Sequence, residues 1–260
     1  MKRILSVILV SFLGVILSSF SKTNAKVTLP KEFKDLKVVS YIPMAEHDEK
    51  EISSYFMFSN EVTNIDYKEF VYWIKTNGTT EELNTVKVDT CLWKNISIEG
   101  NDYLCENYKK WASFPVVNIS KEAAVKYCEW LSKIWNEKQN EYKVTFRLPT
   151  KTEWEYAACG GLNKIEYPWG GPNVKNNKNC YLAQFKAFGL KLGPVEVKSY
   201  APNNYGLYDM SGNVAEMVQE GIVKGGSWNS NSKEISIEYD GEYEKSPYVG
   251  FRPIMELKKR

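Results

Sequence analysis

The sequence predicts an α+β fold that forms a single domain with little regular secondary structure. Helical periodicity is confined to three segments between residues 63 and 159, whereas later residues form short apolar runs separated by Gly, Pro and Asn. Helices early in the chain and irregular strands later are typical of an α+β domain. No repeat or flexible linker interrupts the chain, so we assign the domain to residues 36–255, after a lead-in over 26–35.

The first expected elements are a strand and a helix. The sequence VVSYIP at residues 38–43 alternates weakly and predicts a short strand. A helix should follow, with Thr63 or Asn64 as its N-cap and Gly78 as its stop signal. Its apolar face has the spacing i, i+3, i+4, i+7 and consists of Tyr67, Phe70, Val71 and Ile74.

A second helix is expected after Ser120, whose hydroxyl can cap the first free N–H groups. The residues on its buried side are Ala124, Tyr127, Cys128, Leu131 and Trp135. A cysteine on such a face is more often packed than reactive. We therefore expect Cys128 to belong to the core.

A third helix should begin at the capping box formed by Thr150 and Glu153. This gives Glu153 a structural role, and we expect the nearby Arg147 to pair with an acid or with carbonyl groups. Trp154, Ala157 and Ala158 form the apolar stripe of this helix. Residues 256–260, ELKKR, are predicted to be a charged tail that frays.

Residues 1–25 have the pattern of a secretory signal peptide. MKR is followed by the apolar run ILSVILVSFLGVILSSF and then by a small residue, Ala25, suited to cleavage. The alternative is an uncleaved membrane anchor, because the run approaches the usual ~20 residues. We expect an exported protein that is periplasmic, outer-membrane-associated or secreted, and that contacts the membrane only through an uncleaved signal, if at all.

The positive net charge of the chain comes from this leader. Three of the 34 basic residues and none of the 32 acidic residues lie in residues 1–25, so the remainder has a net charge of −1. No basic face for nucleic acid is therefore predicted.

Five cysteines, an odd number, constrain the disulfides and the metals. Cys91 and Cys105 flank a short loop and are the favoured pair, with Cys159 and Cys180 as a further candidate pair. The cysteine spacings match no zinc motif, and the one histidine, His47, cannot build a His-based metal centre.

Seven motifs occur in an order that identifies a family resemblance. They are EVTNIDYKEF, PVVNISKEAAVKYCEWLS, RLPTKTEWEYAACGG, YPWGG, NNYGLYDMSGNVAEM, KGGSW and GFRP. Together they resemble the formylglycine-generating enzyme, or sulfatase-modifying factor, family over most of the chain. The resemblance implies a C-type-lectin-like fold, often with bound calcium.

The family's enzymes oxidise a sulfatase cysteine with two cysteines that bind copper(I). Thiolates suit this chemistry because they are soft ligands that undergo redox steps. The matching positions after Gly225-Gly226-Ser227 are Ser230 and Ile235, and no cysteine follows Cys180. Neither side chain replaces a thiolate, so we expect no catalytic residues of this type and no bound copper.

The resemblance also implies a calcium site in the stretch LYDMSGNVAE. The ligands would be the side chains of Asp209 and Glu216 and the carbonyls of Gly212 and Val214. Carboxylate and carbonyl oxygens are the ligands that calcium prefers. The alternative is that Asp209 caps the turn and Glu216 is a solvated residue.

Two functions remain open. The first is a non-catalytic binding or assembly module of the bacterial envelope, whose partner is a protein or a glycan; the resemblance extends to related gliding-motility lipoproteins. The second is a formylglycine-generating oxidase, or another enzyme that uses a different site. The lost thiols favour the first.

Overall fold

The computed structural model describes residues 30, 33, 39–47, 50–89, 108–163 and 165–260. The favoured Cys91–Cys105 pair and the lead-in over 26–35, except Pro30 and Phe33, lie outside these residues. Within the described part, no helix is both long and apolar enough to cross a bilayer.

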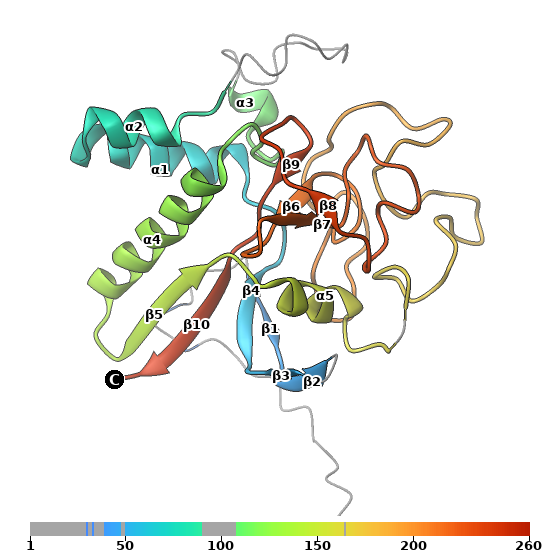
Figure 1. The fold of residues 1–260 in the computed structure, drawn as a ribbon, viewed down its shortest axis with the longest axis horizontal. Coiled ribbons are helices and arrows are strands. Elements are labelled where there is room, and N and C mark those ends of the chain that lie inside the picture. The colour runs from blue at the N-terminus through green and yellow to red at the C-terminus, as the bar shows by residue number, and fades with distance from the viewer. Residues whose placement is uncertain (1–29, 31–32, 34–38, 48–49, 90–107, 164) are drawn as a thin grey trace, which may run out of the picture.

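The first half of the fold is a helix layer packed on a four-stranded antiparallel sheet (Figure 1). The strands follow the order β1-β4-β10-β5. Their bounds are β1 Val39–Ile42, β4 Tyr55–Phe58, β10 Ile254–Lys259 and β5 Tyr142–Arg147. Two short strands between β1 and β4, β2 Ala45–His47 and β3 Lys50–Ile52, form a separate hairpin.

The helices confirm the expected caps. Helix α1 (Asn64–Asn77) has Thr63 as its N-cap, and α4 (Lys121–Lys138) is capped by Ser120. Helix α5 (Lys151–Cys159) has the Thr150–Glu153 capping box. Two shorter helices are α2 (Thr80–Val86) and α3 (Tyr108–Trp111).

Two large hydrophobic clusters form the core, one under α1 and α4 and the other under α5. The apolar faces of α1 and α4 pack with residues of β4, β5 and β10 in one cluster, which includes the buried Cys128. A second cluster forms around Trp154 of α5 and includes Met57 and Ile254 from the sheet. Burial raises the pKa of the Cys128 thiol far above its usual value, as expected for a packed cysteine.

Two expectations are corrected. Residues 256–259 are not a frayed tail, because they belong to β10 and pair with β5 from Thr145 to Tyr142. Cys159 is buried and Cys180 is exposed, and the structure forms no disulfide between these two described residues.

The second half of the chain builds the site-bearing region. Four short strands have the order β8-β7-β6-β9, with β6 and β9 parallel. Their bounds are β6 Ala215–Met217, β7 Ile222–Lys224, β8 Gly241–Glu242 and β9 Val249–Gly250. The described residues between α5 and β6 form turns and loops, drawn in yellow and orange on the right of Figure 1.

Candidate functional site

The Gly-Gly-Ser turn after β7 places Ser230 at a cavity. Gly225 and Gly226 have φ values of 80° and 62°, the region that favours glycine. A Cβ at Gly226 would lie 2.5 Å from the carbonyl oxygen of Glu234. The turn therefore folds tightly against residue 234, and only glycine fits at the point of contact.

A hydroxyl network fixes the two serines of this turn. Ser230 Oγ accepts a hydrogen bond of 3.0 Å from the backbone N–H of Ser227, and the two Oγ atoms are 3.5 Å apart. The N–H of Asn229 donates to Ser227 Oγ. Ser230 therefore acts here as a turn-forming residue.

The cavity beside Ser230 has a volume of about 310 Å³ and a polar lining. Its acidic residues are Glu234, Glu242 and Glu244, and its aromatic residues are Tyr239 and Tyr248. Ser227, Asn229 and Ser230 add hydroxyl and amide groups, and no Lys, Arg, His or Cys is among its lining residues. Such a lining can accept and donate many hydrogen bonds, but it contains no thiolate.

Ile235, the second position that the resemblance singles out, does not line this cavity. Its side chain is 0% exposed and packs with Tyr167, Ala183 and Phe185. The structure thus separates the two positions: Ser230 lies at a cavity wall and Ile235 lies in a hydrophobic cluster. Neither position offers a soft metal ligand.

Glu216 is held by a buried ion pair rather than exposed to a cation. Arg252 donates to both Glu216 carboxylate oxygens at 2.7–3.0 Å, and the indole N–H of Trp154 donates to Glu216 at 2.7 Å. The same guanidinium donates to the carbonyls of Phe58 and Tyr208. Arg252 and Glu216 are 0% and 1% exposed, so this cluster joins three distant segments inside the core.

Asp209 has an unsatisfied oxygen. Its Oδ2 accepts a 2.6 Å hydrogen bond from the N–H of Lys198, but its Oδ1 is buried and without a hydrogen-bond partner among the described residues. Burial is the main reason that the pKa of Asp209 is raised to about 6. A buried acceptor in this state would gain from a cation.

Glu61, which the sequence analysis did not identify, is a further buried acidic residue close to Asp209 and Glu216. It is 0% exposed, and its Oε1 accepts from the side-chain amide of Asn213 at 3.0 Å. Its Oε2 is buried without a partner in the described part, and its pKa is raised by burial and then by the charge of Asp209. In the sequence, Glu61 lies two residues before the N-cap of α1, and nothing in that position indicates a buried carboxylate close to Asp209.

The calcium ligands predicted from the sequence are therefore available only in part. Asp209 and Glu61 each offer a free carboxylate oxygen, whereas Glu216 is fully engaged by Arg252 and Trp154. Gly212 lies against Gln184, with no room for a Cβ, and Val214 is buried. Among the described residues, no three His, Cys, Asp or Glu side chains converge as a metal-binding group.

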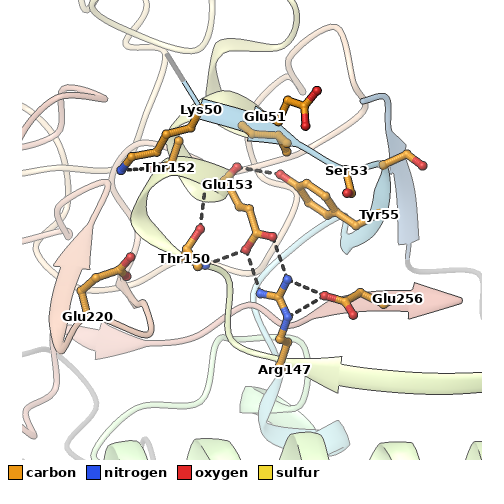
Figure 2. A pocket seen from close by; sticks show the side chains of 12 residues that line it. Lys50, Glu51, Ser53, Tyr55, Arg147, Thr150, Thr152, Glu153, Glu220 and Glu256 are labelled. Atoms are coloured by element: carbon orange, nitrogen blue, oxygen red, sulfur yellow. Dashed lines mark hydrogen bonds and ion pairs between the residues drawn. The ribbon is translucent and has the colours of Figure 1, made fainter. Parts of the chain in front are cut away.

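A second cavity, of about 450 Å³, lies at the start of α5 (Figure 2). Figure 2 shows the Arg147 guanidinium between Glu153 and Glu256. Its hydrogen bonds to Glu153 are 2.7 and 2.8 Å long, and its Nε donates to Glu256 at 2.7 Å. Burial raises the pKa of Glu153, but hydrogen bonds from Arg147 and Thr150 outweigh it and leave the pKa lowered. The expected pairing of Arg147 with an acid is confirmed. Its N–H groups donate to Glu153 and Glu256 and so join α5 to β10.

The fold and the two sites define an α+β domain with a polar cavity at a Gly-Gly-Ser turn and an acidic core site. Residues 22–257 match the Sulfatase-modifying factor enzyme 1-like domain, and the chain belongs to this family.

Relatives of both catalytic and inactive description match part of the chain. The chain is 38% identical over 109 residues to the formylglycine-generating enzyme of Thermomonospora curvata, covering 39% of this chain and 32% of that protein. It is 36% identical over 129 residues to the inactive C-alpha-formylglycine-generating enzyme 2 of Bos taurus, covering 44% and 38%. The matched part thus spans well under half of these relatives' length.

The fold is also similar to that of CarF, with a TM-score of 0.59 at 21% identity. The match covers 85% of this chain and 96% of that one. At this identity the likeness shows the fold and not the activity.

Proposed function

We propose that this protein is an exported, non-catalytic member of the family that acts as a protein- or glycan-binding module of the bacterial envelope. The main support for this proposal is that neither position 230 nor position 235, which match the copper-binding cysteines of the family's enzymes, holds a sulfur ligand. Ser230 is fixed in a turn, and Ile235 is buried among Tyr167 and Phe185. A copper(I) site needs soft ligands at these places.

The cavity beside Ser230 is the binding surface that we favour. Tyr239 and Tyr248 provide flat apolar surfaces, and the surrounding carboxylates, hydroxyls and amide provide hydrogen-bonding groups. Aromatic faces next to such polar groups suit a sugar or a polar peptide segment. The sequence resemblance to gliding-motility lipoproteins supports a role in an envelope assembly.

The runner-up is a formylglycine-generating oxidase, which the 38% identity to the Thermomonospora curvata enzyme favours. The test incubates the protein with copper(I), oxygen and a Cys-x-Pro-x-Arg peptide and measures aldehyde formation by mass. We expect no aldehyde and no stoichiometric copper. Turnover by the unaltered protein would refute the non-catalytic proposal.

A cavity-filling variant tests binding separately. Glu242→Trp, at an exposed lining residue on β8, should abolish capture of an envelope protein or glycan by the immobilised protein, whereas Tyr72→Ser on α1 should not. If both variants capture the same ligand as the unaltered protein, the cavity is not the binding surface.

We further propose that calcium stabilises the acidic core site. Asp209 and Glu61 would supply carboxylate oxygens, and the carbonyls of Gly212 and Val214 would complete the set. Calcium would supply charge compensation for two buried carboxylates, which is a structural role. The support is the pair of buried, unsatisfied oxygens.

A further inference from the structure

The loop around Phe188 presents an aromatic side chain fully to solvent. Phe188 is 99% exposed, more than any other large hydrophobic residue in the described part, and Leu192 close by is 42% exposed. An exposed aromatic gains nothing from folding, and exposed apolar groups often mark interaction sites. We call residues 186–193 the Phe188 loop.

The loop is held in a defined conformation. The side-chain amide of Gln184, which is 3% exposed, donates to the carbonyls of Lys191 and Gly193 at 2.7 and 2.8 Å. Leu190 N–H closes a turn onto the carbonyl of Ala187. These hydrogen bonds fix the loop backbone before binding, which lowers the entropy cost of binding.

Two further contacts join the loop to the body of the protein. Tyr181 Oη donates to the Phe188 carbonyl at 3.1 Å, and the N–H of Lys186 donates to the carbonyl of Ser230 at 2.9 Å. Ala187 and Leu190 pack on the cluster that contains Ile235. These contacts hold the backbone of the loop, while the Phe188 ring stays exposed at the tip.

The Phe188 loop itself carries only positive charge, from Lys186 and Lys191. Residues 167–185 before it contain Lys175 and Lys178 and no Asp or Glu, and Glu166 and Glu196 border the whole stretch. Lys178, Lys186 and Lys191 are exposed. A loop with exposed lysines and an aromatic tip complements an anionic lipid bilayer, where each lysine contributes about 1 kcal/mol of attraction.

A stable protein interface is a poorer fit to the same surface. Such interfaces bury roughly 800 Å² on each partner, with an apolar centre from which lysine is depleted. Here one ring and one partly exposed leucine stand among lysines. Shallow insertion between lipid headgroups needs no larger apolar area.

We propose that the Phe188 loop inserts its tip into the headgroup region of an anionic bilayer and so orients the domain on a membrane. This inference does not depend on the ligand of the Ser230 cavity. It also adds a membrane contact separate from the apolar segment near the N-terminus.

The test measures hydrogen exchange of amides 186–192 in the full chain with vesicles. Because this readout is local, attachment through the N-terminal segment does not produce it. Phosphatidylcholine vesicles with phosphatidylglycerol should slow exchange at the tip by about tenfold or more, the scale expected for burying a Phe side chain. Pure phosphatidylcholine should slow it less, and added salt should reduce the difference.

Variants on exposed residues make the test decisive without disturbing the core. Phe188→Ser should remove the protection, and Lys186→Glu with Lys191→Glu should remove its dependence on anionic lipid. Tyr72→Ser, at a 66% exposed aromatic on α1, is the matched control and should leave it unchanged. Equal exchange with and without vesicles, or protection that survives Phe188→Ser, would overturn the proposal.

Discussion

Replacing Arg252 by Met tests whether the buried ion pair holds the two halves of the domain together. The guanidinium is 0% exposed and makes charge-assisted hydrogen bonds to Glu216 and further bonds to two backbone carbonyls. Removing one partner of a buried pair costs about 3–5 kcal/mol, and each orphaned carbonyl adds about 1 kcal/mol or more. We therefore expect Arg252→Met to lower the unfolding free energy by about 5 kcal/mol or more.

Urea unfolding followed by circular dichroism measures this loss. The double variant Arg252→Met, Glu216→Gln should be more stable than Arg252→Met alone, because it no longer buries an uncompensated charge. The control is Lys245→Met, whose partner Asp89 lies 2.9 Å away at a partly exposed site and which should cost less than about 1 kcal/mol. A loss below about 1 kcal/mol for Arg252→Met, or no recovery in the double variant, would refute this reasoning.

Three further predictions concern the core site, the turn and the second cavity. Asp209→Asn should raise the unfolding free energy at neutral pH in a chelator by up to about 3 kcal/mol, because the Asp209 pKa is raised from 3.8 to about 6. With calcium the sign should reverse in thermal unfolding, and an equal gain in both conditions would exclude calcium there. Gly226→Ala should lower the melting temperature and cost roughly 2 kcal/mol or more, since φ is 62° and the Cβ meets Glu234; an unchanged midpoint would contradict the turn geometry. The lowered pKa of Glu153 gives stability that is complete above its unfolded pKa near 4.5 and is lost as pH falls through the lower folded value. Urea midpoints of Glu153→Gln should therefore fall less steeply below pH ~4 than those of the unaltered protein, and parallel curves would exclude this source of acid sensitivity.

Local patterns predicted α1, α4 and α5 correctly because the physics that forms them is local, but α2 and α3 were not expected. A cap hydroxyl and its N–H partner lie three residues apart, as Thr150 and Glu153 do. The apolar spacing of the second helix likewise identified the burial of Cys128 and Trp135. The pairing of Arg147 followed from its position beside a buried segment.

Long-range contacts limited what could be predicted of the site. Glu61 meets Asn213 across 152 residues, and no local signal links them. Glu216 was expected from the family resemblance to face a cation, but its partner Arg252 comes from a different motif and occupies both oxygens. The exposure of Phe188 was equally hidden, because FKAFGLKL matches a buried apolar run as well as a surface tip.

The position of β10 makes the completion of the four-stranded sheet depend on the last residues of the described chain. This strand lies between β4 and β5, although both of those strands are translated long before it. Until β10 is available, β4 and β5 each lack the strand that pairs with one of their edges. A chain that ends before residue 254 should therefore leave these two edges open and should not reach the native sheet.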